Sequence, residues 1–293
     1  MFRAFFILAA LLTALPAFAQ YEVSLKLDRI NYISQEPMTA TVTIVNRSGA
    51  DVILGGPGGR PWLSFNVKDS QERSLSPLQS TSDEPIIFQA GTTLSHKVKL
   101  GETHSITDEG TYAITVSAYH PATGQYYISN RARFVITDVK PYGKPIVFGV
   151  PTGYPEAGRS RRYVIMVHRD MDRSYLYFRL VDDRSGQKLQ TYMLGTVSVV
   201  REPQMTLDRE NNLHVMFMAA PDLTIHQIIG PDGKSKAREF FRDTETTRPQ
   251  LFLTRENMVV ARGGLQFDPI AENAKLKEAA SKERSVSERP PGL

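Results

Sequence analysis

Residues 21–28 read Tyr-Glu-Val-Ser-Leu-Lys-Leu-Asp, in which apolar and polar side chains alternate from one position to the next. Neighbouring side chains of a β-strand point to opposite faces, so this period of two predicts a strand with one buried and one solvated face. The alternation returns in three later segments, residues 39–44, 94–100 and 114–118. Turn sequences such as Asn46-Arg47-Ser48-Gly49 separate the segments. We therefore expect residues 20–138 to form an antiparallel β-sandwich.

A short motif, Asp108-Glu109-Gly110-Thr111-Tyr112, leads into one of these strands. Its Asp-x-Gly-x-Tyr spacing resembles the tyrosine corner of immunoglobulin-like domains. The resemblance covers residues 21–138 and extends to macroglobulin-type and fibronectin-type modules, because Glu36-Pro37 precedes a strand rich in threonine and valine. It implies that the Tyr112 hydroxyl bonds to nearby backbone and that residues 125–137 form the last strand of the domain.

The second half of the chain contains an internal similarity. Residues 203–211 and 249–257 are identical at six of nine positions and lie 46 residues apart. Each segment reads as strand, polar turn and strand, and four short strands per repeat resemble a β-propeller blade of the sialidase or kelch kind. About two and a half repeats fit into residues 144–267, whereas a closed propeller needs about four. We therefore expect residues 139–268 to form a second antiparallel β-domain with an internal repeat of about 46 residues.

Such an unclosed repeat leaves several arrangements open. It can collapse into an open sheet or a sandwich, pack its edges on the first domain, or be completed by another chain. We favour the first two of these arrangements. Strand edges that stay exposed are natural sites for pairing with a partner strand.

Both ends of the chain differ from the domains between them. Arg3 precedes an apolar run, residues 5–15, which closes on Ala17-Phe18-Ala19. This pattern predicts a signal peptide, residues 1–19, that is cleaved between Ala19 and Gln20, and hence a periplasmic or secreted protein. Residues 269–293 predict a tail with a polar helix over 271–284 followed by a disordered end.

The bulk composition limits the classes of function. The chain has 35 Lys and Arg, 31 Asp and Glu, and no cysteine. Without cysteine it forms no disulfide, thiolate nucleophile or cysteine zinc site. Charges of both signs are interspersed, so we expect no nucleic acid partner. After the leader, no apolar run approaches the about 20 residues of a membrane-spanning helix, so we expect no membrane span.

Few residue patterns point to chemistry. His168, Asp170 and Asp172 have the spacing of one strand face, but we expect the chain to reverse there, which breaks that face and argues against a metal site. His214 and His226 lie within apolar strands and are expected to be hydrogen-bonded interior residues. We predict no catalytic residue, cofactor or metal.

One surface has the composition of a binding site. In the hairpin expected over residues 112–136, Ala132, Phe134 and Ile136 alternate toward the core. The opposite face would then present four candidate partner-binding residues, Tyr119, Tyr127, Arg131 and Arg133. Tyrosine and arginine are enriched at protein interfaces. The alternative is that this face packs against the second half of the same chain.

These observations favour a non-catalytic, extracytoplasmic binding or scaffolding protein of the bacterial envelope. Its expected partner is a protein or a polysaccharide. One alternative is a hydrolase of envelope glycan or peptide with its site at the domain junction. Another is a secreted protease inhibitor that presents the loop at residues 55–60.

Overall fold

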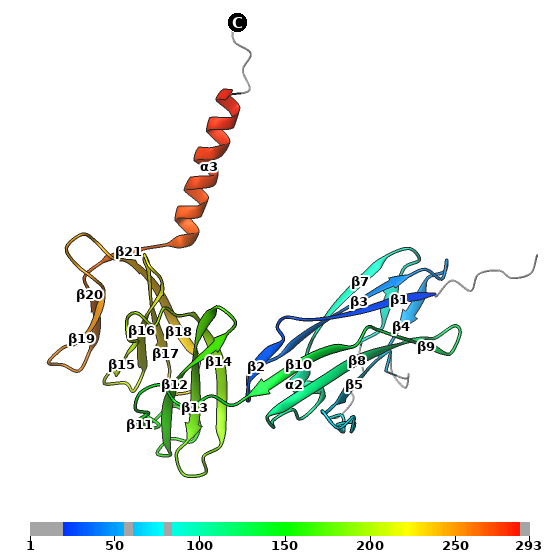
Figure 1. The fold of residues 1–293 in the computed structure, drawn as a ribbon, viewed down its shortest axis with the longest axis horizontal. Helices are drawn as coiled ribbons and strands as arrows, with labels where there is room; N and C mark the ends of the chain where they lie inside the picture. The colour runs from blue at the N-terminus through cyan, green and yellow to red at the C-terminus, as the bar shows by residue number, and fades with distance from the viewer. Residues whose placement is uncertain (1–19, 56–60, 79–83, 288–293) are drawn as a thin grey trace, which may run out of the picture. The chain divides into compact units, whose positions relative to one another are not determined.

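The computed structural model describes residues 20–55, 61–78 and 84–287, and of residues 280–287 only the backbone (Figure 1). The predicted signal peptide, positions 56–60 of the candidate inhibitor loop and residues 288–293 lie outside the described residues. The protein is all-β, and in the part of the chain that the structure describes about 54% of the residues lie in strands and 6% in helices. It divides into two compact units, with the boundary between Asp138 and Val139.

The described residues of the first unit form three sheets. The first sheet has the antiparallel order β1-β3-β7, with β1 at Tyr21–Leu27, β3 at Thr39–Asn46 and β7 at Thr93–Lys99. The second has the order β2-β10-β8-β5 with β9 also on β8, and its strands are β2 Asn31–Ile33, β5 Leu63–Lys68, β8 Gly110–His120, β9 Gln125–Ile128 and β10 Ala132–Thr137. The third pairs β4, Val52–Leu54, with β6, Ile86–Phe88. The short helix α2 spans Leu100–Thr103.

Alternating side chains of these sheets meet in one core. Val42 of β3, Ile114 of β8 and Phe134 of β10 are fully buried members of the same apolar cluster. Burial of such apolar surface is the main favourable contribution to folding. The Tyr112 hydroxyl donates to the Asp108 carbonyl oxygen at 2.9 Å, which is the contact that the Asp-x-Gly-x-Tyr motif predicts.

The last strand of the first unit differs from the prediction. Instead of one strand over residues 125–137 there are two, β9 and β10, separated at 129–131. Ser129 fills the break, because its Oγ accepts a hydrogen bond from the Val116 N–H at 3.0 Å. Ala118 pairs with Tyr127 before the break, and Ile114 pairs with Ala132 after it. Between these two pairs β8 advances by four positions, whereas the segment opposite advances by five. One extra residue is therefore inserted opposite β8, as in a β-bulge.

The second unit begins with an antiparallel sheet of order β11-β12-β13-β14, whose strands are β11 Ile146–Gly149, β12 Ser160–Asp170, β13 Arg173–Asp182 and β14 Lys188–Thr196. The next sheet has the order β15-β16-β17-β18-β21, with β15 Gln204–Leu207, β16 Leu213–Ala220, β17 Leu223–Ile229, β18 Ser235–Arg242 and β21 Leu265–Phe267. A separate hairpin pairs β19, Gln250–Leu253, with β20, Val259–Arg262.

These two larger sheets share a core. Phe178 and Leu180 of β13 belong to the same buried cluster as Val215 and Phe217 of β16. Of the arrangements that the sequence leaves open, the structure therefore has two sheets packed against each other within the unit. The β19–β20 hairpin lies beside β15 and β16 (Figure 1), and the Leu251 N–H donates to Gln204 Oε1 at 2.8 Å.

The two similar nine-residue segments form turns of the same kind. Asn211 and Asn257, their last residues, both have positive φ, 60° and 56°. Asparagine tolerates this left-handed conformation better than most residues. The side chain three positions earlier caps each turn, since Asp208 Oδ1 accepts from the Asn212 N–H and Thr254 Oγ1 from the Met258 N–H. Duplication of the whole 46-residue repeat remains a prediction.

Helix α3 spans Pro269–Ser287 and so extends beyond the predicted 271–284 at both ends. Asp268 caps its start, because its Oδ1 accepts a hydrogen bond from the Ile270 N–H at 2.8 Å. Arg242 of β18 makes two hydrogen bonds to the Glu272 carboxylate, at 2.8 and 2.7 Å. No helix in the described part of the chain is long and apolar enough to cross a membrane.

Candidate functional site

The four predicted partner-binding residues do not share one patch. Tyr127 of β9 pairs with the buried Ala118 of β8 and packs on the core, with its ring centroid 5.4 Å from that of Tyr21. Tyr119 pairs instead with Tyr126, at a centroid distance of 5.1 Å. The expectation that Tyr119 and Tyr127 share the outward face is therefore wrong. The cause is the extra residue at Ser129, because a slip of one residue moves a side chain to the other face.

The two arginines of the predicted surface are also separated from Tyr119. Arg131 forms an ion pair with Glu72. Arg133 is exposed and pairs with Ala113, six positions from Tyr119 along β8. At about 3.3 Å per residue this spacing is roughly 20 Å. A role of the four residues in partner binding stays a prediction, but they cannot act as one compact surface.

A groove of about 570 Å³ lies in the first unit between the strands β5 and β7. Both are end strands of their sheets, and among the described residues each pairs along its length with one strand only. A local bridge from Lys68 to Ser74 covers the end of β5. The groove is lined by Pro61, Leu63, Ser64, Phe65, Pro77, Leu78, His96, Lys97, Val98, Lys99, Glu102, Thr103 and His104.

His104 is the most deeply buried polar residue of the groove lining, at 1% exposure. Its Nδ1 lies 3.1 Å from Thr103 Oγ1, whereas its Nε2 has no hydrogen-bond partner among the described residues. Burial lowers the pKa of His104, so its ring is neutral at neutral pH. A buried polar atom without a partner calls for an explanation, and one explanation is a bound group that completes the bond.

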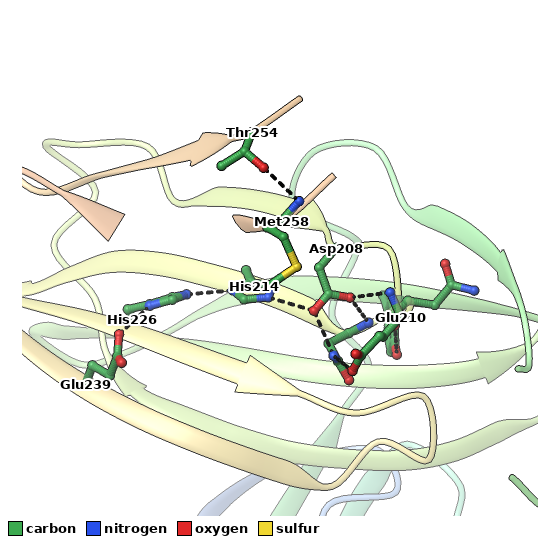
Figure 2. A network of polar contacts seen from close by, with 10 residues as sticks. Asp208, Glu210, His214, His226, Glu239, Thr254 and Met258 are labelled. Atoms are coloured by element: carbon green, nitrogen blue, oxygen red, sulfur yellow. Dashed lines mark hydrogen bonds and ion pairs between the residues drawn. The ribbon is translucent and has the colours of Figure 1, made fainter. Parts of the chain in front are cut away.

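A second polar site crosses the sheet β15–β18 of the second unit (Figure 2). Four side chains form a row, and we call this row the histidine array: Asp208, His214, His226 and Glu239. His214 Nε2 lies 3.3 Å from Asp208 Oδ2, His214 Nδ1 lies 2.9 Å from His226 Nε2, and His226 Nδ1 lies 2.8 Å from Glu239 Oε2. The row follows from the register, since His226 pairs with Glu239 on β18 and is the diagonal neighbour of His214 on β16.

The interior of the array is shielded from water. The side chains of His214 and His226 are 6% and 3% exposed, and that of Asp208 is 12% exposed, whereas Glu239 reaches 35%. Burial lowers the pKa of His214, although its hydrogen bond to Asp208 opposes the shift. Burial would raise the pKa of Asp208, but its hydrogen bonds from Asn212 and His214 prevail and hold that pKa below the ordinary value. Asp208 is therefore a carboxylate beside a neutral ring at neutral pH.

The array is connected to the β19–β20 hairpin. Asp208 Oδ1 accepts from the N–H groups of Glu210 and Asn212, which fixes the turn after β15. Within that turn the Arg209 N–H donates to the Asn257 carbonyl oxygen, at 2.8 Å, in the turn of the hairpin. The side chain of Met258 points toward His214 (Figure 2). One polar network thus joins three strands of the sheet to the hairpin that lies on it.

Sequence reasoning identified part of these sites. The prediction that His214 and His226 are hydrogen-bonded interior residues is confirmed. Their carboxylate partners were missed, because only the strand register shows that Glu239 lies opposite His226. The expected reversal near Asp170 is also found, as a hairpin in which Asp170 pairs with Arg173. Among the described residues no group of three or more histidine or acidic side chains is placed to bind a metal ion.

Comparison with known proteins gives no family for this chain. No family model matches the sequence, and no curated protein matches it. A solved structure, that of the sporulation control protein Spo0M from Bacillus subtilis, aligns with 58% of this chain and 83% of its own, at 10% sequence identity. The TM-score of 0.25 is too low for this likeness to carry an argument about fold or function.

Proposed function

We propose that the chain is a non-catalytic binding or scaffolding protein of the bacterial envelope, in which an immunoglobulin-like sandwich precedes a β-domain of propeller-like blades. The signal peptide expected from residues 1–19 supports the location. The bond from the Tyr112 hydroxyl to Asp108 supports the immunoglobulin-like assignment. The groove between β5 and β7 is the observation that carries the binding function.

The groove suits an extended polypeptide. Two end strands border it, and an end strand presents unpaired N–H and C=O groups to which a partner strand can add. Leu63, Phe65 and Val98 give the lining an apolar character that would accept alternate side chains of such a strand. His104 at the floor would offer one polar contact. Of the two partner classes that the composition leaves open, these features favour protein over polysaccharide.

Site-specific cross-linking in the envelope tests this proposal. A photoreactive side chain at Ser64, an exposed residue of the groove lining, is expected to capture a partner in intact cells. The same side chain at Ser95, an exposed residue of β7 outside the lining, serves as the matched control. Ser64→Trp should fill the groove and abolish capture of that partner by the purified mature chain, whereas Ser95→Trp should not. Equal capture by both tryptophan variants would contradict the proposal.

A further inference from the structure

The contacts of the histidine array determine how many protons its two rings must hold. Three contacts join four groups, and each contact needs one hydrogen between its two heavy atoms. The ionised carboxylates of Asp208 and Glu239 at the two ends can only accept. A neutral imidazole carries one N–H, so two neutral rings supply two hydrogens for three contacts. One contact would then bring two lone pairs together, either those of a carboxylate oxygen and a ring nitrogen or those of the two facing ring nitrogens.

Adding or removing protons changes how many of these contacts are made. With one extra proton on the two rings, all three contacts contain a hydrogen. With two extra protons, both rings carry two N–H groups, and donors face each other across the 2.9 Å contact between His214 Nδ1 and His226 Nε2. The array is fully satisfied in one protonation state only. Either neighbouring state leaves a buried polar contact unmade, which is costly away from water.

The surroundings indicate where the extra proton resides. His226 contacts the more exposed carboxylate, Glu239, whereas His214 donates to the less exposed one, Asp208. The lowered pKa of His214 agrees with a neutral ring at that position. The charged groups that face the two rings are Asp208, from the turn after β15, and Glu239, from β18. The β19–β20 hairpin contributes the uncharged Met258, whose side chain points toward His214 (Figure 2).

We propose that the histidine array binds one extra proton, shared by His214 and His226, and that this proton holds the β19–β20 hairpin on the sheet. The connection runs through the Asp208 turn and its bond from Arg209 to Asn257. The array is thus a pH-sensitive clamp built into the second unit. This inference concerns regulation of the second unit and is independent of the groove in the first.

The sign of the pH dependence follows from proton linkage. In the unfolded chain the two histidines titrate near pH 6.5, so together they bind two protons well below that pH and none well above it. The folded array keeps one. Below about pH 6.5 the unfolded chain binds more protons, and stability rises with pH. Above about pH 6.5 the folded chain binds more, and stability falls with pH. The contribution of the array to stability is therefore largest near pH 6.5.

Glu239→Gln separates this proposal from a merely structural role of the array. The amide of the new side chain can donate to His226 Nδ1, so two neutral rings then satisfy all three contacts without an extra proton. Stability of the variant should rise with pH through about 6.5 and then stay level, whereas that of the natural protein should fall again. His168→Gln, in the other sheet of the unit, is the matched control and should leave the maximum in place.

The experiment uses the full mature chain. Long-range ¹H–¹⁵N spectra of the imidazoles are recorded between about pH 5.5 and 8.5, and hydrogen exchange of the β19–β20 amides, corrected for its intrinsic pH dependence, is measured over the same range. We expect one cationic and one neutral ring for His226 and His214 near pH 6.5, and maximal protection of the hairpin there. Two neutral rings at pH 6.5, or protection that varies with pH alike in the natural protein and Glu239→Gln, would overturn the proposal.

Discussion

Buried histidines occur in both units, but they are partnered in opposite ways. In the first unit, His104 Nε2 and both ring nitrogens of His120 have no hydrogen-bond partner among the described residues. His120 is instead held by ring packing, with its centroid 4.5 Å from that of Tyr21. In the second unit, His214 and His226 use all four ring nitrogens in the histidine array.

The difference shows how one residue type can give two responses to pH. Burial lowers the pKa of His104 and His120, so these rings bind protons less readily in the folded protein than in the unfolded chain, where they gain them below about pH 6.5. The first unit therefore loses stability as the pH falls below about 6.5, whereas its stability does not change as the pH rises above that value. The stability of the second unit has a maximum near pH 6.5 instead, because the rings of His214 and His226 share one bound proton.

Breaking the array should have the largest effect. His226→Ala leaves two carboxylates and one imidazole in a buried site with missing contacts, and we expect the free energy of unfolding of the second unit to fall by about 3 kcal/mol. Urea denaturation followed by circular dichroism measures this loss. Trp62, the single tryptophan, is buried in the first unit, and its fluorescence should give an unchanged midpoint.

His168→Ala provides the control for this prediction. His168 is a half-buried residue of the same unit that lies outside the array, and its removal should cost less than about 1 kcal/mol. Equal losses of stability for His168→Ala and His226→Ala would show that the array contributes no more to stability than a half-buried histidine outside it.

The two asparagine turns should rank next. Asn211→Ala and Asn257→Ala each place alanine in the left-handed region, at a cost of about 1 kcal/mol. Asn211 also donates from its side chain to the Gly149 carbonyl oxygen at 3.0 Å, so its replacement should cost about 1 kcal/mol more. Thermal unfolding of the paired variants checks the order. A larger loss for Asn257→Ala would contradict the assigned contacts.

The smallest effect is expected for His120→Phe in the first unit. Replacing an unpartnered buried polar ring by an apolar one removes a desolvation penalty while keeping the contact with Tyr21. We expect a gain of about 1 kcal/mol or less, read from the urea midpoint of Trp62 fluorescence. A loss of stability would mean that the ring nitrogens of His120 are bonded, for example to internal water.

Local sequence pattern was sufficient for much of the fold and failed at one identifiable place. Alternation located the strands β1, β3, β7 and β8, and the Asp-x-Gly-x-Tyr motif located the Tyr112 bond. Nothing in the local pattern marks the extra residue at Ser129, because its hydroxyl is bonded to Val116, 13 positions away across the hairpin. The faces of Tyr119 and Tyr127 were therefore assigned alike, although the bulge separates them.

The candidate sites were harder to foresee because both depend on how strands are placed. Asp208 and Glu239 lie 31 positions apart and meet through two histidines only once β16, β17 and β18 are in register. The groove depends on β5 and β7 being the end strands of their sheets. The alternation of apolar and polar residues does not predict this strand order. Periodicity fixes which side chains of a strand share a face, but not which strands become neighbours.

The contrast between the two units is tested most directly by amide hydrogen exchange across both units in one sample of the mature chain, between about pH 5.5 and 8.5 and corrected for intrinsic rates. Protection in β16, β17 and the β19–β20 hairpin should pass through a maximum near pH 6.5, while protection in β3 and β8 should rise to that pH and then level off. Parallel curves for the two units, without a maximum in the second, would contradict the assignment of a bound proton to the histidine array.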